Sequence, residues 1–189
     1  YKIKQMLEMS GLTEQTRVPA GKLSAGWRQR LGLGCAIISE PSILFLDEPT
    51  SGVSPIARRG FFKIIRELAG NGTTVMLTTH FMDEAERCHH IAFISEGNLI
   101  ANDTPKNLKK NVIEGCMVTI EMPNIMEKFL EIQKLPYVLE CSIHGASLHI
   151  VLENEDLIPV LEKHTGFQAQ KIVPSLEDVF LALSKREVN

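Results

Sequence analysis

The chain has 189 residues, of which 44% are hydrophobic and 23% are charged, values typical of a globular protein. This apolar content is enough to fill a core, which excludes disorder over most of the chain. Lys and Arg number 20 and Asp and Glu number 23, so the net charge is −3. Composition therefore indicates no general attraction to nucleic acids or acidic lipids.

The four cysteines are Cys35, Cys88, Cys116 and Cys141, and none forms a C-x-x-C pair. Their spacing predicts neither a zinc ribbon nor a disulfide framework, and we interpret them as buried thiols in a reducing compartment. No apolar run approaches the roughly 18 residues that span a bilayer, and no signal peptide is visible. Because the chain begins at Tyr1, inside an amphipathic segment, we expect an N-terminal part to be missing.

The first 110 residues predict alternating helices and strands. Apolar residues follow helical spacing in three segments, 1–9, 24–39 and 56–68. The apolar run 43–46 and the β-rich run 73–79 predict two strands buried on both faces, as in a parallel sheet. The helix between these strands completes a βαβ crossover.

Three further signals belong to this part of the chain. Ser24 is predicted to be the N-cap of the second helix. Residues 81–88 indicate a short helix, whose charged residues predict a solvated face. Segments 91–95 and 99–102 flank Glu96-Gly97-Asn98, which is typical of a β-hairpin.

The pattern changes after Thr104-Pro105. The predicted strands are 118–122, 138–143, 148–152 and 167–173, and the predicted helices are 125–134, 157–164 and 176–183. The order β-α-β-β-α-β is typical of a small α+β ferredoxin-like unit. We therefore predict an α/β chain with two domains, residues 1–110 and residues 111–189.

The strongest chemical signal is an acid pair at a strand end. Asp47 and Glu48 follow the buried run 43–46, and Pro49 closes the strand. Ligands of open α/β sheets bind at the carboxyl ends of strands. One carboxylate suits Mg²⁺, and its neighbour suits the orientation or deprotonation of a water molecule.

Two further signals accompany the acid pair. Ser24, Ala25 and Gly26 begin a helix, where unpaired backbone N–H groups and small side chains favour a phosphate. His80 follows the strand 73–79, whose carboxyl end is expected at the same sheet edge as Glu48. Each signal alone is as well explained by an ordinary capped helix or a structural histidine.

In combination, these features resemble the second half of the ATPase domain of ABC transporters. Residues 23–31 are similar to the signature motif, 43–48 to the Walker B strand with its catalytic glutamate, 51–55 to the D-loop, His80 to the switch histidine, and 174–180 to the ending of exporter-type subunits. The likeness is strong over the first 110 residues and loose beyond them. It implies a partial P-loop NTPase core.

The resemblance also implies cofactors and roles. ATP and Mg²⁺ would be bound, with Asp47 supporting the metal, Glu48 acting as general base and His80 holding the γ-phosphate. Catalysis of this kind rests on positioning and charge stabilisation.

The family's head-to-tail dimer implies a second set of contacts. Ser24, Ala25 and Gly26 would contact an ATP molecule held by a second ATPase domain. Ser54, in the D-loop, is counted with these cofactor-binding residues.

The chain departs from the family pattern in three places. It contains no G-x-x-x-x-G-K-[ST] motif, so the phosphate loop and the Q-loop are expected to be missing and the isolated chain to be inactive. Ala25 and Trp27 stand where the signature motif commonly has glycine and glutamine. Ser54 replaces the usual D-loop aspartate.

The function that the resemblance implies is ATP hydrolysis driving a transporter, most simply an exporter. Its expected partners are transmembrane permease subunits and a second ATPase domain, not nucleic acid, and its expected location is cytoplasmic, on the inner face of the membrane. The alternatives are an ABC ATPase that serves no transporter and a non-catalytic or regulatory module of the same fold.

Metal sites elsewhere are not predicted. His89 and His90 have no carboxylate or cysteine at ligand spacing. Cys141, His144 and His149 are close in sequence, but strand alternation puts Cys141 and His144 on opposite faces.

Overall fold

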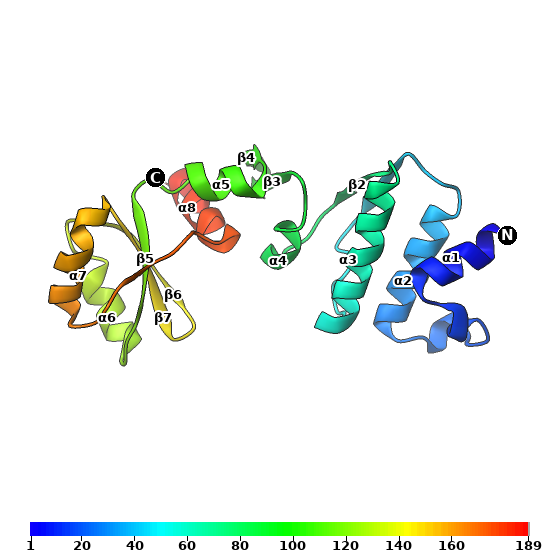
Figure 1. Ribbon diagram of the computed structural model, residues 1–189, viewed down its shortest axis with the longest axis horizontal. Coiled ribbons are helices and arrows are strands. Elements are labelled where there is room, and N and C mark those ends of the chain that lie inside the picture. The colour runs from blue at the N-terminus through cyan, green and yellow to red at the C-terminus, as the bar shows by residue number, and fades with distance from the viewer. Residues whose placement is uncertain (189) are drawn as a thin grey trace. The chain divides into compact units, whose positions relative to one another are not determined.

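The computed structural model describes residues 1–188 (Figure 1). The chain divides into two compact units, one from Tyr1 to Glu84 and one from Ala85 onward. Among the described residues, no helix combines the length and apolar character that a bilayer crossing requires.

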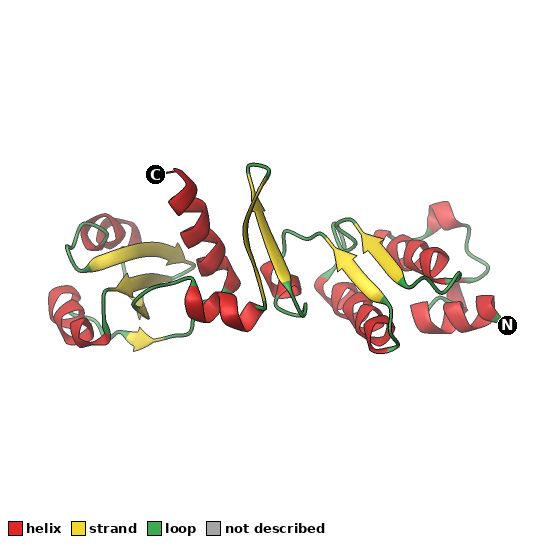
Figure 2. Cartoon of the chain, turned by 90° about the horizontal axis from the view of Figure 1, so that it is seen from above, coloured by secondary structure: helices red, strands yellow, loops and turns green. Residues whose placement is uncertain are grey.

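The first unit contains a parallel strand pair and its crossover helix. Its elements are α1 (Lys2–Ser10), α2 (Ala25–Ile37), β1 (Ile43–Leu46), α3 (Pro55–Gly70), β2 (Thr74–Leu77) and the start of α4 (Met82–Ala85). β1 and β2 run parallel, with Leu44 opposite Val75 (Figure 2). The predicted βαβ crossover is confirmed.

Helix α3 has clear start and stop signals. The Ser54 hydroxyl accepts a hydrogen bond from the Ala57 N–H, and Pro55 occupies the first helical position, where its missing N–H costs nothing. Asn71 caps the end, and Gly72 follows with a φ of 94° that favours glycine. These local signals explain why the sequence predicted the helix closely.

The sheet of the first unit is buried on one face only. Leu44, Leu46, Val75 and Leu77 pack with apolar residues of α1, α2 and α3. The opposite face is exposed, since Ile43, Phe45 and Met76 keep 54%, 72% and 60% of their surface. The prediction of strands buried on both faces was wrong, because the described helices of this unit pack against one face alone.

The second unit begins with a hairpin and continues into a four-stranded sheet. Its remaining elements are β3 (Ile91–Ser95), β4 (Asn98–Asp103), α5 (Pro105–Asn111), β5 (Cys116–Glu121), α6 (Ile125–Ile132), β6 (Val138–His144), β7 (Ser147–Leu152), α7 (Ile158–Thr165), β8 (Gln170–Lys171) and α8 (Leu176–Val188). The hairpin turn at Glu96 and Gly97 has positive φ at both residues, as a two-residue turn requires.

The larger sheet has the order β6-β7-β5-β8, and its neighbouring strands are antiparallel. If these four strands are numbered 1 to 4 along the chain, starting from β5, their order in the sheet is 2-3-1-4. The first and third strands of the β-α-β-β-α-β segment, β5 and β7, therefore lie side by side. The ferredoxin-like arrangement predicted from the sequence is confirmed for this segment.

One face of this sheet forms the principal core of the unit. Val118, Ile120, Leu148, Ile150 and Leu152 are fully buried. They pack against apolar residues of α6 and α7, which cover this face. These side chains form the largest fully buried group in the part of the chain that the structure describes.

The compact units differ in extent from the two predicted domains. α8 packs against β4 and α5, and the rings of Phe93 and Phe180 lie 5.4 Å apart. The hairpin and α5 therefore belong to the second unit by packing, although the sequence placed them with the first domain. The boundary at residue 110, drawn from the change of sequence pattern after Thr104-Pro105, stays a prediction.

The cysteines divide between surface and core. Cys116 and Cys141 are buried, Cys88 is half-buried and Cys35 is exposed. The prediction of buried thiols was therefore wrong for Cys35 and only partly met for Cys88. Cys35, Cys116 and Cys141 are free thiols.

Candidate functional site

The carboxyl ends of β1 and β2 bring an acid and an imidazole together. Glu48 follows β1, and His80 follows β2 after two threonines. The His80 Nδ1 atom lies 3.5 Å from the Glu48 Oε1 atom. Because parallel strands end at the same sheet edge, the sequence predicted this juxtaposition, and the contact confirms it.

Thr78 ties the two strand ends to each other. Its hydroxyl donates a hydrogen bond to the Asp47 Oδ1 atom and accepts one from the Glu48 N–H at 3.0 Å. Glu48 itself has a φ of 39°, in the left-handed region that few non-glycine residues adopt. The backbone thus turns sharply after Asp47, and the two acids leave the strand in different directions.

The acid and the imidazole are open to solvent. Glu48 and His80 keep 51% and 55% of their side-chain surface, and Asp47 is also exposed. An exposed ion pair of this kind contributes at most about 1 kcal/mol to stability. The geometry therefore leaves these side chains accessible to a ligand.

A buried carboxylate lies behind the exposed pair. Glu84 is 1% exposed, and it accepts hydrogen bonds from the hydroxyls of Thr50 and Thr79. Thr50 follows β1 and Thr79 follows β2, so Glu84 joins the segments that carry Glu48 and His80. Sequence analysis missed this network, because it interpreted the charges of residues 81–88 as a solvated face.

Arg58 of α3 completes the network. Its Nε atom lies 3.4 Å from the Glu84 Oε1 atom, and its guanidinium stacks 3.6 Å from the centre of the Phe81 ring. Phe81 in turn lies against His80, with ring centroids 4.0 Å apart. Arg58 and Glu84 thereby restrict the segment that carries the imidazole. The only sequence signal for Glu84 was its place among the charged residues of the short helix predicted at 81–88.

The predicted phosphate-binding helix start lies beside the loop after β1. Ser24 is the N-cap of α2, but its side chain makes no capping hydrogen bond. A Cβ atom on Gly26 would lie 3.4 Å from Ala57 and 3.5 Å from Val53, which are ordinary contact distances, so the start of α2 packs beside the start of α3. Ala25 is half-buried.

Ser54 and Trp27 have local structural contacts. The Ser54 hydroxyl caps α3, as described above. Trp27 is half-buried, and the guanidinium of Arg30 lies 5.2 Å from its ring centre, one turn along α2. The cap explains serine at position 54 without reference to a ligand.

The oxygen groups at the strand ends suit Mg²⁺, which prefers carboxylate and water oxygens. Asp47 supplies an exposed carboxylate that Thr78 holds in place. A phosphate loop of the Walker type is not found in the sequence. The strand ends therefore present exposed carboxylates of the kind that suits Mg²⁺, while the sequence contains no motif for a loop that would enclose the β-phosphate.

A cavity of about 570 Å³ in the second unit contains none of the predicted site residues. Its lining includes Lys106, Lys109, Lys110 and Lys171 with Glu86. Lys109 pairs with Glu86 at 3.1 Å, and Lys171 pairs with Glu155 outside the lining.

Known proteins match this chain over the residues described above. The profile of the ABC transporter family matches residues 1–51, which contain the start of α2, β1 and the acid pair. The Nod factor export ATP-binding protein I of Burkholderia pseudomallei is 36% identical over 188 residues, which are 98% of this chain and 61% of that protein. The chain is similar to ATP-binding proteins of ABC transporters.

Further matches agree with this relationship. The probable multidrug ABC transporter ATP-binding protein YbhF of Escherichia coli is 34% identical over 183 residues, covering 95% of this chain and 32% of that protein. The solved structure of a nucleotide-free ATP-binding cassette from an ABC transporter is 26% identical, with a TM-score of 0.55, and the match covers 58% of this chain and 44% of that one. The chain thus spans less than two thirds of these relatives.

Proposed function

We propose that this ABC-related chain forms part of an ATPase whose hydrolysis of ATP drives export through membrane partners. The observation that carries the proposal is the contact between Glu48 and His80 at the carboxyl ends of two parallel strands, beside Asp47. Relatives named for Nod factor export and for multidrug transport support the direction of transport.

Glu48 and His80 have distinct roles in this proposal. The Glu48 carboxylate orients the attacking water and accepts its proton, and the Glu48 N–H bond to Thr78 fixes the turn that presents it. His80 donates a hydrogen bond to the terminal phosphate from a position 3.5 Å from Glu48. Asp47 supports Mg²⁺, which when bound neutralises phosphate charge.

The start of α2 serves a second nucleotide in the proposed dimer. Ser24, Ala25 and Gly26 present backbone N–H groups at the positive end of the helix dipole, which favours a phosphate held by a second ATPase domain. The uncapped Ser24 hydroxyl suits the same contact. Ser54, in the adjoining loop, lies near this second nucleotide.

The proposed partners are transmembrane permease subunits and a second ATPase domain, identical or related. The corresponding location is the cytoplasmic face of the membrane, where the chain would be peripheral. Copurification of the complete protein with a permease from detergent-solubilised membranes tests this part of the proposal.

The decisive experiment concerns Glu48. Residues 1–189 are joined to the N-terminal part of the Burkholderia relative, and phosphate release from Mg·ATP is measured. We expect turnover by the hybrid and a loss of at least about 100-fold in Glu48→Gln, because the amide accepts no proton. ATP binding should persist in that variant. Residues 1–189 alone should show no turnover.

Glu96→Gln is a matched control. Glu96 is exposed and has a positive φ of 47°, so it shares the backbone setting of Glu48 without the neighbouring imidazole. It should retain full turnover. Normal turnover in Glu48→Gln would remove Glu48 from the role of base, whereas equal losses in both variants would point to misfolding.

A further inference from the structure

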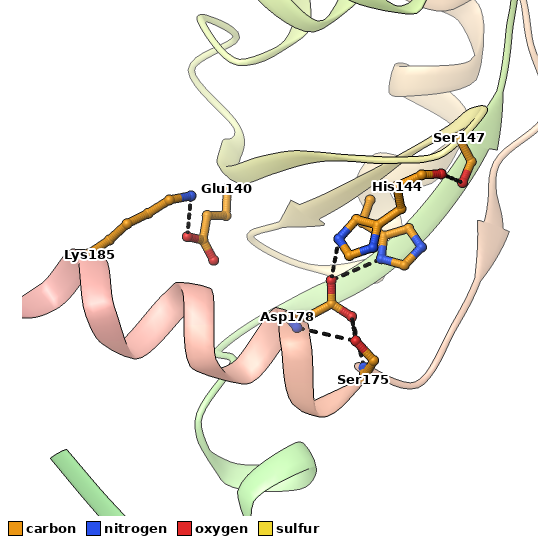
Figure 3. Close-up of polar contacts among 7 residues, drawn as sticks. Glu140, His144, Ser147, Ser175, Asp178 and Lys185 are labelled. Atoms are coloured by element: carbon orange, nitrogen blue, oxygen red, sulfur yellow. Dashed lines mark hydrogen bonds and ion pairs between the residues drawn. The ribbon is translucent and has the colours of Figure 1, made fainter. Parts of the chain in front are cut away.

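Three side chains of types that can ligate a metal meet in the second unit, and none of them is among the site residues described above. The His144 Nε2 atom and the His149 Nδ1 atom lie 3.1 Å and 2.9 Å from the same oxygen, Oδ1 of Asp178 (Figure 3). The three ligand atoms lie within 4.8 Å of one another. β6, β7 and α8 each contribute one of these residues.

The strand register explains how the two histidines meet. His144 pairs with Ser147 and Ser142 pairs with His149 across β6 and β7, so the histidines are diagonal neighbours on one face. Cys141 lies on the other face, within the core, as alternation predicted. The sequence prediction against a metal site considered Cys141 as the third ligand and did not consider Asp178.

Asp178 is held by a capping box at the start of α8. The Ser175 N–H and hydroxyl both donate to the Asp178 Oδ2 atom, at 2.8 Å and 2.6 Å, and the Asp178 N–H donates to the Ser175 hydroxyl at 3.2 Å. These bonds engage Oδ2 and direct Oδ1 toward the imidazoles (Figure 3). The carboxylate is 1% exposed, so its orientation is fixed by protein groups.

His144 carries a nitrogen that the hydrogen bonds of the protein leave unsatisfied. Its Nε2 atom is buried, yet no partner meets hydrogen-bonding geometry there, although Asp178 lies 3.1 Å away. The rings of His144 and His149 stack at 3.9 Å with 11° between their planes. A buried nitrogen without a hydrogen bond costs about 1–3 kcal/mol, unless a further ligand engages it.

We propose that His144, His149 and Asp178 bind a divalent transition-metal ion, with Zn²⁺ as the test ion, and that this ion fastens α8 to the β6–β7 hairpin. Two imidazoles and one carboxylate are donors that Zn²⁺ accepts, and three protein ligands leave a fourth position for water. Mg²⁺ suits the cluster poorly, because it prefers oxygen ligands.

Binding requires only small movements. Zn²⁺ bonds of about 2.0–2.1 Å in a tetrahedron place ligand atoms roughly 3.3 Å apart, close to the 3.1 Å and 2.9 Å seen between the nitrogens and Oδ1. The stacked rings must tilt so that each nitrogen lone pair meets the ion. Asp178 can stay in place, since the Ser175 bonds involve its other oxygen.

Calorimetric titration of the full chain with ZnCl₂ at neutral pH, after removal of metals with a chelator, tests the proposal. We expect one ion to bind per chain and the melting temperature to rise with zinc. His144→Gln and His149→Gln should each weaken binding by about 100-fold or more, beyond the loss typical of outer-shell changes. MgCl₂ should give no such signal.

Two further variants separate metal binding from structure. His164→Gln removes a histidine that contacts a carboxylate, Glu131, at 3.0 Å on the surface of the same unit, and it should bind zinc like the wild type. Ser175→Ala weakens the capping box but keeps all three ligands, so it should lower stability and retain zinc binding. Absence of zinc binding by the wild type, or unchanged binding in His149→Gln, would overturn the proposal.

Discussion

Both units contain strands rich in apolar residues, yet their sheets are covered differently. In the second unit, Val118, Leu148 and Ile150 are 0% exposed beneath α6 and α7. In the first unit, Phe45 is 72% exposed, although its neighbour Leu44 is 5% exposed. A run of apolar residues therefore predicts a strand, while the number of buried faces depends on which elements pack against it.

The polar clusters of the two units differ in the same way. In the first unit, Glu48 and His80 are half-exposed, and the buried Glu84 stabilises the segments behind them. In the second, the ionisable groups at Asp178 are largely buried. Open groups suit exchange of a soluble ligand, whereas enclosed groups suit a lasting structural contact. Substitutions in each unit sharpen this comparison.

The largest expected effect is in the second core. Leu148→Ala should lower the free energy of unfolding of that unit by about 2–5 kcal/mol, because it leaves a cavity among fully buried side chains. Phe45→Ala, on the exposed face of the first unit, should change stability by no more than about 0.5 kcal/mol. Hydrogen exchange resolves the two units, and equal effects would contradict the contrast.

A smaller effect depends on pH. Burial raises the pKa of the Cys141 thiol to about 11, from an ordinary value of 9.0. A raised folded-state pKa contributes stability that is full below pH 9 and is lost as pH rises through 11. The loss should reach about 2 kcal/mol by pH 11.

Urea unfolding of the wild type and of Cys141→Ala between pH 8 and pH 11 measures this effect. The wild type should lose more stability than the variant as pH rises, since other titrating groups are common to both. Parallel curves would show that Cys141 is open to solvent when folded.

The smallest effect concerns the carboxylate behind the first site. Glu84→Gln should cost about 1–1.5 kcal/mol, because the amide oxygen still accepts from one threonine hydroxyl while its NH₂ group faces the other. Arg58 loses its contact with the Glu84 carboxylate but keeps the one with Asp83 at 3.7 Å. Glu86→Gln is the control, since Glu86 pairs with Lys109 at the surface, where such pairs contribute less than about 1 kcal/mol. If thermal unfolding gave the same loss of stability for Glu84→Gln and Glu86→Gln, Glu84 would not belong to a buried network.

Local signals made much of the fold predictable. The helical spacing of apolar residues in α3 and the hairpin turn at Glu96-Gly97 each act within a few residues, so the sequence alone indicated them. The meeting of Glu48 and His80 was also predictable, because the parallel strands of a βαβ unit end at the same edge of the sheet.

Contacts between distant segments were not predictable in the same way. Thr50 and Glu84 are 34 residues apart, and His149 and Asp178 are 29 apart. Each pair depends on how a helix docks on strand ends or on a sheet, which periodicity does not determine. The exposed Phe45 was missed for the same reason, since its environment is decided by packing against other elements.

The left-handed backbone at Glu48 limits how the role of this residue can be studied. Valine or isoleucine there would strain the main chain and shift the Thr78 contact, so a loss of turnover would mix backbone distortion with the missing acid. Asparagine and glycine tolerate the conformation far better, and glutamine keeps the shape of the side chain. In a substitution scan at this position, most variants therefore report how well the left-handed backbone accepts the new residue. Only glutamine, which keeps the shape of the side chain, reports on the loss of the acid itself.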